Sequence, residues 1–202
     1  LHRVYARGTF AHTRSDGLTL HRLIETSYEK GLYEISFMLF KKMFDYKMVL
    51  RNKFFSTNNE VEYKCVFLGM IDFFDITWEE TGIYLAKHFP IKFMHFVMNK
   101  INSIYEKYVI VGMANKEIDP LYDLFYSLER EHYYTDLDKV IFLLCKGVCQ
   151  IISIAETNDS QFVKVYVLEC LKSESVLLRN LGIKLLRIVT LFSSDEKYKL
   201  LI

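Results

Sequence analysis

The strongest constraint on this chain is the width of the apolar surface on its later helices. Between residues 136 and 192 the sequence predicts three consecutive helices, and in the last of them apolar residues recur at helical spacing over about half of the cylinder. The members of this arc are Leu177, Leu178, Leu181, Gly182, Leu185, Leu186, Ile188, Val189 and Phe192. An earlier helix, residues 140–155, is apolar almost all round. Helices of this kind need a neighbour on each flank, as in stacked helix-pair repeats.

Helical patterns continue through the whole chain, and no segment shows a convincing strand alternation. The predicted helices cover residues 18–29, 32–44, 45–55, 60–75, 78–88, 90–99, 101–113, 120–133, 137–155, 160–172, 175–192 and 196–202, and residues 1–13 are a short basic segment with some helical character. Loops are short, and helix pairs recur at roughly 40–47 residues. The sequence therefore predicts an all-α, HEAT/armadillo-like α-solenoid of about ten to twelve helices in antiparallel pairs.

Helix starts and stops are marked by capping patterns. Thr57, Thr77 and Ser193 each stand three residues before a glutamate, which is the spacing of a capping box. Asp119-Pro120 and Pro90 place proline at the first helical position, where its missing N–H costs nothing. Ser15-Asp16-Gly17 is expected to cap the next helix, and Gly31 to end it. Gly69, Gly147 and Gly182 lie inside predicted helices, and we expect close approach of a neighbouring helix to compensate.

Composition fits one well-packed domain. The chain has 202 residues, of which 51% are hydrophobic and 15% aromatic, and this excludes disorder. Two prolines and eight glycines argue against an all-β protein. We expect residues 1–202 to form a single α-helical repeat domain, part of a longer protein. The net charge of +1 gives no global attraction to nucleic acid, but an acidic middle lies between basic ends.

The four cysteines lie inside apolar runs without the spacing of a disulfide framework. They are Cys65, Cys145, Cys149 and Cys170. We interpret them as small buried hydrophobic residues in a reducing compartment. No signal peptide opens the sequence, and uninterrupted apolar runs are shorter than the ~20 residues of a membrane span. The sequence predicts a nuclear or cytoplasmic protein with no membrane contact.

No catalytic or metal-binding spacing is present in the sequence. His88 and His95 are separated by Pro90, and no His-Glu-x-x-His pattern occurs. Cys145 and Cys149 could share a metal but lack a second pair of ligands. Asp72 and Asp75 could act as an acid–base pair, but a solvated helix side is the simpler interpretation. We therefore expect no enzymatic activity, no catalytic residues, no cofactor and no metal.

Two charged patches are candidate binding surfaces. The basic patch comprises Lys41, Lys42, Lys47, Arg51 and Lys53, with Phe44, Tyr46, Phe54 and Phe55 interleaved. It could bind nucleic acid or an acidic or phosphorylated peptide, although a solvated helix face over core aromatics explains the same pattern. The acidic patch comprises Glu117, Asp119, Asp123, Glu129 and Glu131, with Asp136 and Asp138 beyond it. It could dock a basic segment or simply face solvent.

The order of segments resembles the helical-repeat region of the regulatory subunit 3 family of protein phosphatase 4, the SMEK/Falafel proteins. The similar segments are residues 1–7, 20–40, 62–74, 89–98 and 177–202. The resemblance implies a non-catalytic subunit that helps direct a Ser/Thr phosphatase, largely in the nucleus. The family's N-terminal peptide-reading domain is absent from these residues.

These observations predict a protein-interaction scaffold that recruits substrates or partners, in line with a phosphatase regulatory subunit. Its partners would be proteins, including a Ser/Thr phosphatase catalytic subunit or its scaffold. The alternative is a nucleic-acid-binding helical-repeat protein that uses the basic N-terminal third, with affinity that falls steeply with salt.

Overall fold

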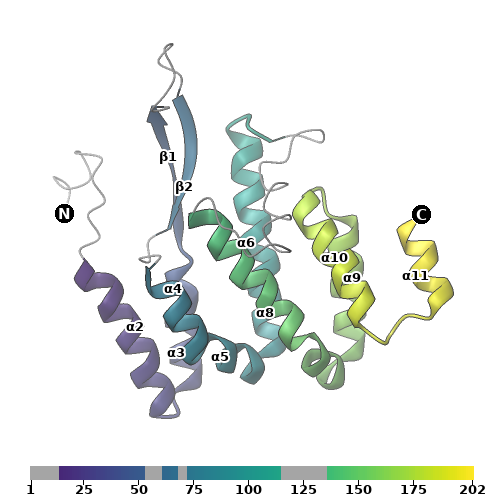
Figure 1. The fold of residues 1–202 in the computed structure, drawn as a ribbon, viewed down its shortest axis with the longest axis horizontal. Helices are drawn as coiled ribbons and strands as arrows, with labels where there is room; N and C mark the ends of the chain where they lie inside the picture. The colour runs from purple at the N-terminus through teal and green to yellow at the C-terminus, as the bar shows by residue number, and fades with distance from the viewer. Residues whose placement is uncertain (1–13, 53–60, 68–71, 115–135) are drawn as a thin grey trace.

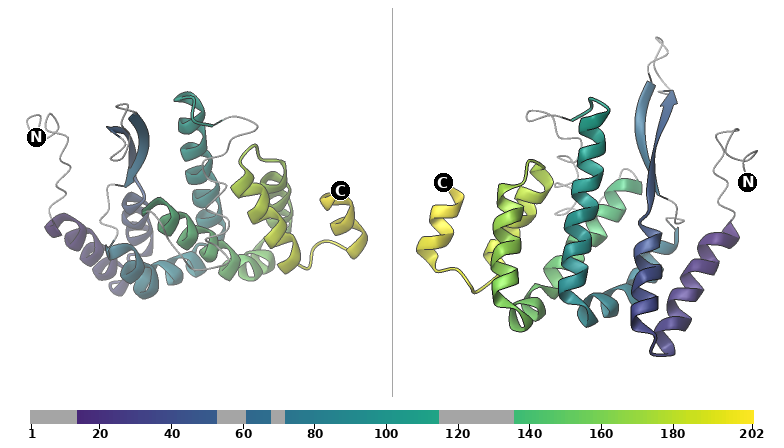
Figure 2. Two further views of the ribbon diagram at one scale, coloured as in Figure 1. Left: turned by 45° about the horizontal axis from the view of Figure 1, so that its top comes forward. Right: turned by 180° about the vertical axis from the view of Figure 1, so that it is seen from behind.

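The computed structural model describes residues 14–52, 61–67, 72–114 and 136–202. Helices dominate these residues, so the predicted all-α class is confirmed, with one β-hairpin as the exception. The helices stand in a curved row with α2 at one end and α11 at the other (Figures 1 and 2). Their bounds are α2 (Arg14–Glu29), α3 (Tyr33–Met43), α4 (Asp72–Thr77), the π-helix η1 (Trp78–Gly82), α5 (Ile83–His88), α6 (Pro90–Ile110), α8 (Asp136–Asn158), α9 (Ser160–Lys172), α10 (Val176–Ile188) and α11 (Ser194–Leu201).

Sequential helices pack as neighbours along the row. α2 packs on α3, α6 on α8, and α9 on α10, while α8 contacts both helices of the last pair. The turn between α2 and α3 contains Gly31 with φ +73°, a left-handed conformation that favours glycine. The basic segment 1–13, the predicted helix 120–133, the capping box at Thr57, the Asp119-Pro120 cap and Gly69 lie outside the described residues.

The prediction of helices over 45–55 and 60–75 is wrong for residues 46–52 and 61–67, which are strands, whereas residues 72–75 are helical as predicted, at the start of α4. Strands β1 (Tyr46–Asn52) and β2 (Val61–Phe67) pair antiparallel, and Tyr46 lies opposite Phe67 with ring centroids 6.0 Å apart. Tyr46 and Met48 are half-buried while the intervening Lys47 is exposed, which is the period of two of a strand. The hairpin projects from one side of the helical row (Figure 1).

Several other predicted boundaries also change. α6 is one continuous helix from Pro90, where two helices meeting near residue 100 were expected. α2 begins at Arg14, so the expected break at residues 15–17 does not occur. The predicted helix 78–88 begins as the π-helix η1, directly after α4, and Thr77 has helical φ and ψ with no capping hydrogen bond. The capping box at Ser193 is present and starts α11.

The wide apolar arcs of the later helices are confirmed, except that Ile188, a predicted member of the last arc, is 40% exposed. In α10 the side chains of Leu177, Leu181 and Leu185 are fully buried, and the arc widens through Leu178 and Leu186. The helix ends at Ile188, earlier than predicted, because the chain turns extended at Val189. In α8 every residue from Val140 to Cys145 is buried, as expected for a helix with neighbours all round.

One helix among the described residues is long and apolar enough to cross a membrane by length and composition. This is the Lys139–Asn158 part of α8. The most apolar 18-residue stretch within it has a mean hydropathy of 1.7, and 61% of that stretch is buried inside the protein. The central helix of a packed core passes the same test. The observation is therefore weak evidence for a membrane span.

Two helical glycines allow the close packing that the sequence predicted. A Cβ atom at Gly147 of α8 would lie 2.3 Å from the indole of Trp78 and 2.9 Å from Phe93. A Cβ atom at Gly182 of α10 would lie 3.0 Å from the backbone nitrogen of Leu171 on α9. The missing side chains let α8 pack directly on the Trp78 ring and let α10 pack directly on α9.

We expect the thiols of Cys145 and Cys170 to resist alkylation in the folded protein. Both are buried, and this burial raises the pKa of each thiol, so the reactive thiolate does not form at neutral pH. Iodoacetamide labelling followed by peptide mass spectrometry should show each reacting about 100-fold or more slowly than in denaturant. Equal labelling rates in the native and denatured states would contradict the buried assignment.

Candidate functional site

A groove between α3 and α6 is the candidate binding site. It runs along the two helices in two overlapping sections of about 380 and 490 Å³. Met38, which is 53% exposed, and the half-buried Phe96 supply its apolar floor. The residues that line both sections are Met38, Lys41, Phe96 and Asn99. Successive turns of α6 face α3 here because residues three and four apart share a helix face.

The groove carries more positive than negative charge. Its lining includes four lysines, on both helices, and two carboxylates, which leaves an excess of two positive charges. The lysines are Lys41, Lys42, Lys92 and Lys100, and the carboxylates are Glu34 and Asp45. An acidic ligand is therefore attracted to this groove.

The lysines are already held in place by weak contacts. Lys42 and Lys100 lie 3.2 and 3.5 Å from the carboxylate of Asp45, and Lys92 pairs with Glu34. The Lys42–Asp45 and Lys92–Glu34 pairs are at the surface, where such pairs contribute only about 0–1 kcal/mol each, whereas Lys100 is mostly buried. A ligand carboxylate or phosphate can therefore replace them at little cost, while the lysines stay oriented toward the groove.

Several lysines in and near the groove make cation–π contacts with aromatic rings. Lys41 lies over Phe37 with its ammonium 5.2 Å from the ring centroid, and Lys100 lies over Phe96 at 5.8 Å. Lys107, just beyond the groove, lies 4.1 Å from the centroid of Tyr46. The rings beneath these lysines are occupied by cation–π contacts. Phe37 itself is 2% exposed, so its face is not available to stack a base.

A second groove of about 600 Å³ lies on the other side of α6, against α9 and the start of α10. Its charged lining residues are all acidic: Glu106, Glu169 and Glu174. α6 thus separates a basic groove from an acidic one. The predicted acidic patch, Glu117 to Glu131, lies outside the described residues, so this acidic groove is a different surface.

The predicted basic patch is divided by the fold. Lys41 and Lys42 lie in the groove, whereas Lys47 and Arg51 lie on strand β1 and Lys53 falls outside the described residues. The second of the two helices over which the patch was expected does not form, because residues 46–52 are a strand. Lys92 and Lys100 come from α6 instead. Only the fold brings these two lysines to α3, so sequence spacing could not identify them.

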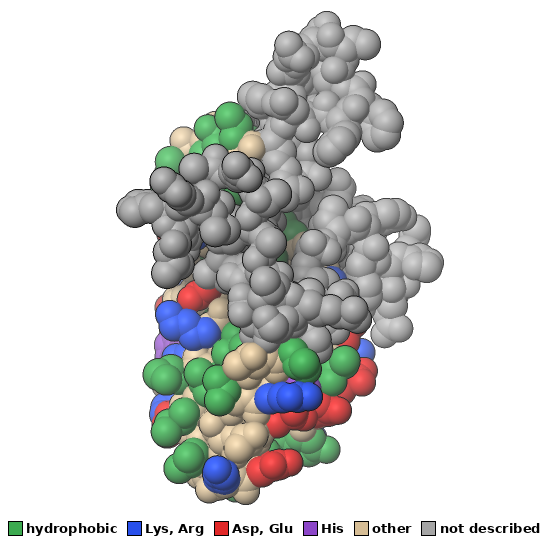
Figure 3. Space-filling model, turned by 90° about the vertical axis from the view of Figure 1, so that its left-hand side faces the viewer, with side chains coloured by type: hydrophobic (Ala, Val, Ile, Leu, Met, Phe, Trp, Pro, Cys, Tyr) green, Lys and Arg blue, Asp and Glu red, His purple; other side chains and the backbone are tan. Residues whose placement is uncertain are grey.

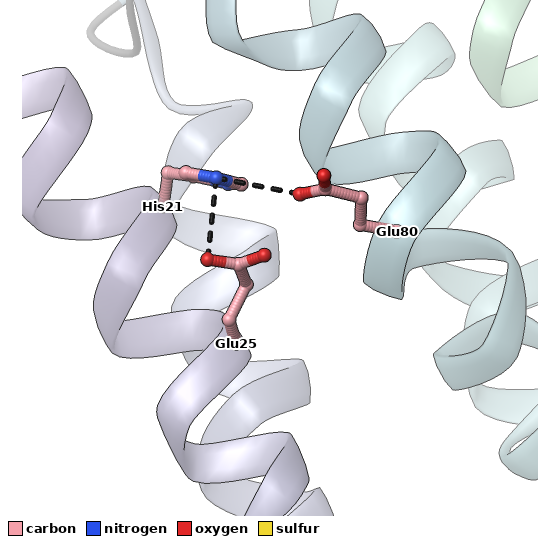
Figure 4. A group of neighbouring side chains, drawn as sticks. All are labelled: His21, Glu25 and Glu80. Atoms are coloured by element: carbon pink, nitrogen blue, oxygen red, sulfur yellow. Dashed lines mark ion pairs between the residues drawn. The ribbon is translucent and has the colours of Figure 1, made fainter.

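A separate cluster of titratable side chains joins α2 to the π-helix (Figure 4). His21 Nε2 lies 3.3 Å from a carboxylate oxygen of Glu25 and 3.5 Å from one of Glu80. Its Nδ1 lies 2.9 Å from the hydroxyl of the buried Thr77. Burial raises the pKa of Glu25, and hydrogen bonding to Glu80 raises this pKa further, against the opposing effect of His21. Figure 3 shows acidic side chains gathered along one edge of this end of the molecule.

No protein-family model, curated protein or solved structure matches this chain. The function must therefore be argued from the site itself. The two features available for that argument are the α3–α6 groove and the His21 cluster. Sequence reasoning missed Glu80 as a partner of His21, since 59 positions separate them. The one local signal was the spacing of four between His21 and Glu25, which puts both side chains on one face of a helix.

Proposed function

We propose that this protein is a HEAT/armadillo-like α-solenoid scaffold that holds an acidic segment of a partner protein in the α3–α6 groove. The curved row of packed helix pairs supports the solenoid assignment, since such stacks create extended binding surfaces. The groove carries the functional part of the proposal. It combines excess positive charge with an apolar floor, which suits an acidic peptide with one apolar anchor.

The apolar anchor would lie between Met38 and Phe96. Met38 is flexible and adapts to ligands of different shape, as methionine does at other binding surfaces. The neighbouring Ile35 is 46% exposed and extends the apolar contact along α3. Carboxylates or phosphates on either side of the anchor would meet Lys41, Lys42 and Lys92.

A regulatory role follows as part of the same proposal. The resemblance to the regulatory subunit 3 family of protein phosphatase 4 suggests that the recruited partner is a substrate or a subunit of a Ser/Thr phosphatase. Recruitment needs no catalytic group on the scaffold. Binding through a surface groove would keep the partner close to the enzyme, and the gain comes from effective concentration.

Reversing the charge of two groove lysines, the half-buried Lys41 and the exposed Lys42, should weaken acidic-peptide binding at least about tenfold. The test uses the Lys41→Glu/Lys42→Glu variant and a fluorescein-labelled 15-residue peptide of alternating glutamates and leucines. Fluorescence anisotropy at several salt concentrations would measure the affinity. Lys184→Glu, an exposed lysine on α10, provides the single-charge control, which should bind like the wild type.

A labelled single-stranded RNA oligonucleotide separates this proposal from nucleic-acid binding. Because the face of Phe37 is covered, the groove offers few rings on which bases can stack, and we expect RNA to bind at least about tenfold more weakly than the peptide. Binding of RNA in preference to the peptide would overturn the proposal. Peptide binding that is equal in the wild type and the double variant would do the same.

A further inference from the structure

The cluster of His21, Glu25 and Glu80 has the donor set of a metal site. One imidazole nitrogen and two carboxylate oxygens all lie within 4.8 Å of one another. His21 and Glu25 are four residues apart on α2, so the helix holds both donors on one face. Glu80 comes from the π-helix η1, and such wider turns occur frequently at functional sites.

The distances in the cluster favour a shared ion over direct hydrogen bonds. Charge-assisted N–H···O bonds are usually about 2.7–2.9 Å long. The two contacts of His21 Nε2, at 3.3 and 3.5 Å, are longer. Zinc bound tetrahedrally by histidine nitrogen and carboxylate oxygen at about 2.0–2.2 Å would hold these donors about 3.4 Å apart. The two separations measured from His21 Nε2 match two edges of such a tetrahedron.

The surroundings of His21 provide the outer support that a metal ligand needs. Ligating histidines usually donate their second N–H to a fixed acceptor, which orients the ring and raises its basicity. The hydroxyl of Thr77 lies 2.9 Å from Nδ1 and is itself fully buried. If Nδ1–H donates to Thr77, the lone pair of Nε2 points between the two carboxylates (Figure 4).

We propose that His21, Glu25 and Glu80 bind one zinc ion that ties α2 to the π-helix. The side chain of His21 is 9% exposed and that of Glu80 is 51% exposed, so one side of the site is open to solvent. A water molecule would complete the four ligands. The imidazole donor and the low ligand count select against magnesium and calcium, which need six or more oxygen ligands.

Metal titration of the purified chain tests the proposal. The protein is stripped with EDTA and titrated with ZnCl₂ in a calorimeter, and Co²⁺ is used as the optical probe. We expect one zinc per chain, and visible Co²⁺ bands typical of tetrahedral nitrogen and oxygen ligands. A thiolate-to-cobalt charge-transfer band, or displacement of Co²⁺ by equimolar Mg²⁺, would overturn the assignment.

Variants separate this site from adventitious binding to other histidines. Glu80→Gln should weaken zinc binding about 100-fold, while Glu79→Gln, its exposed neighbour on η1, makes the same charge change and should leave the affinity unchanged. His88→Ala should also bind normally. Unchanged affinity in Glu80→Gln, or equal losses in Glu79→Gln, would contradict the site.

The role of Thr77 gives a second, independent readout. Thr77→Val keeps the shape of the buried side chain but removes the oxygen, so zinc affinity should fall about 10–100-fold. Thr77→Ser should restore it. Zinc should raise the melting temperature of the wild type and of Glu79→Gln, but not of Glu80→Gln. Thermal unfolding without metal shows whether each variant is folded, so loss of binding is distinguished from loss of structure.

Discussion

Replacing Phe44 with alanine will lower the free energy of unfolding by about 3–5 kcal/mol. Phe44 is 1% exposed and lies where three elements meet. Its ring centroid is 5.0 Å from Phe40 of α3, 5.0 Å from Phe74 of α4 and 5.5 Å from Phe96 of α6. Truncation removes all three contacts and leaves a cavity that rigid neighbours cannot fill.

Urea unfolding followed by circular dichroism would measure the effect of Phe44→Ala. Tyr198→Ala is the matched control, because Tyr198 is 67% exposed on α11 and its loss should change the stability by less than about 0.5 kcal/mol. Since small domains have only about 5–15 kcal/mol of stability, the Phe44 variant should fold but unfold at much lower urea. A loss of less than about 1 kcal/mol would show that Phe44 does not join the three elements.

Gly147→Ala should destabilise the protein by about 1–3 kcal/mol, although alanine is the better helix former. The added methyl group would lie 2.3 Å from the Trp78 ring, which is buried and supported by Phe40 and Phe93. The clash therefore forces the indole or α8 to move. The gain in helix propensity, up to about 1 kcal/mol, does not offset that strain.

The chain contains a single tryptophan, so its fluorescence reports directly on the Gly147 substitution. We expect an emission shift in Gly147→Ala and none in Ser153→Ala, an exposed site on the same helix. In a double-mutant cycle, Gly147→Ala should cost less stability in a Trp78→Leu background than in the wild type, because the smaller leucine relieves the clash. Simple additivity of the two changes would mean that Gly147 and Trp78 are not in contact.

Local rules predicted the elements whose signals lie close together in sequence. The helix over residues 160–172 was predicted with the observed bounds, and the Ser193 capping box is present as expected. The wide arc of α10 is also buried as predicted, apart from Ile188 at its end. In each case the deciding interactions join residues three or four apart, which a sequence displays directly.

Tertiary contacts decided the elements that were predicted wrongly. Residues 61–65 alternate between apolar and polar side chains, but the alternation is short and ends at the apolar Val66 and Phe67, so pairing with 46–52 decides that 61–67 is a strand. Thr77 and Glu80 have capping-box spacing, yet they contact His21 on another helix instead. Of the four groove lysines, the sequence identified Lys41 and Lys42 as candidate binding residues. It did not identify Lys92 and Lys100.

The five-residue π-helix η1 carries both a buried side chain of the core and an exposed side chain of the His21 cluster. Trp78, at its start, packs against α3, α6 and α8, and Glu80, two positions later, faces His21 at the solvent edge. Shortening this π-helix by one residue would rotate the following chain by about 100° relative to the indole. The positions of the buried ring and of the exposed carboxylate thus depend on the same short piece of backbone. An insertion or deletion within it would displace the two side chains relative to each other.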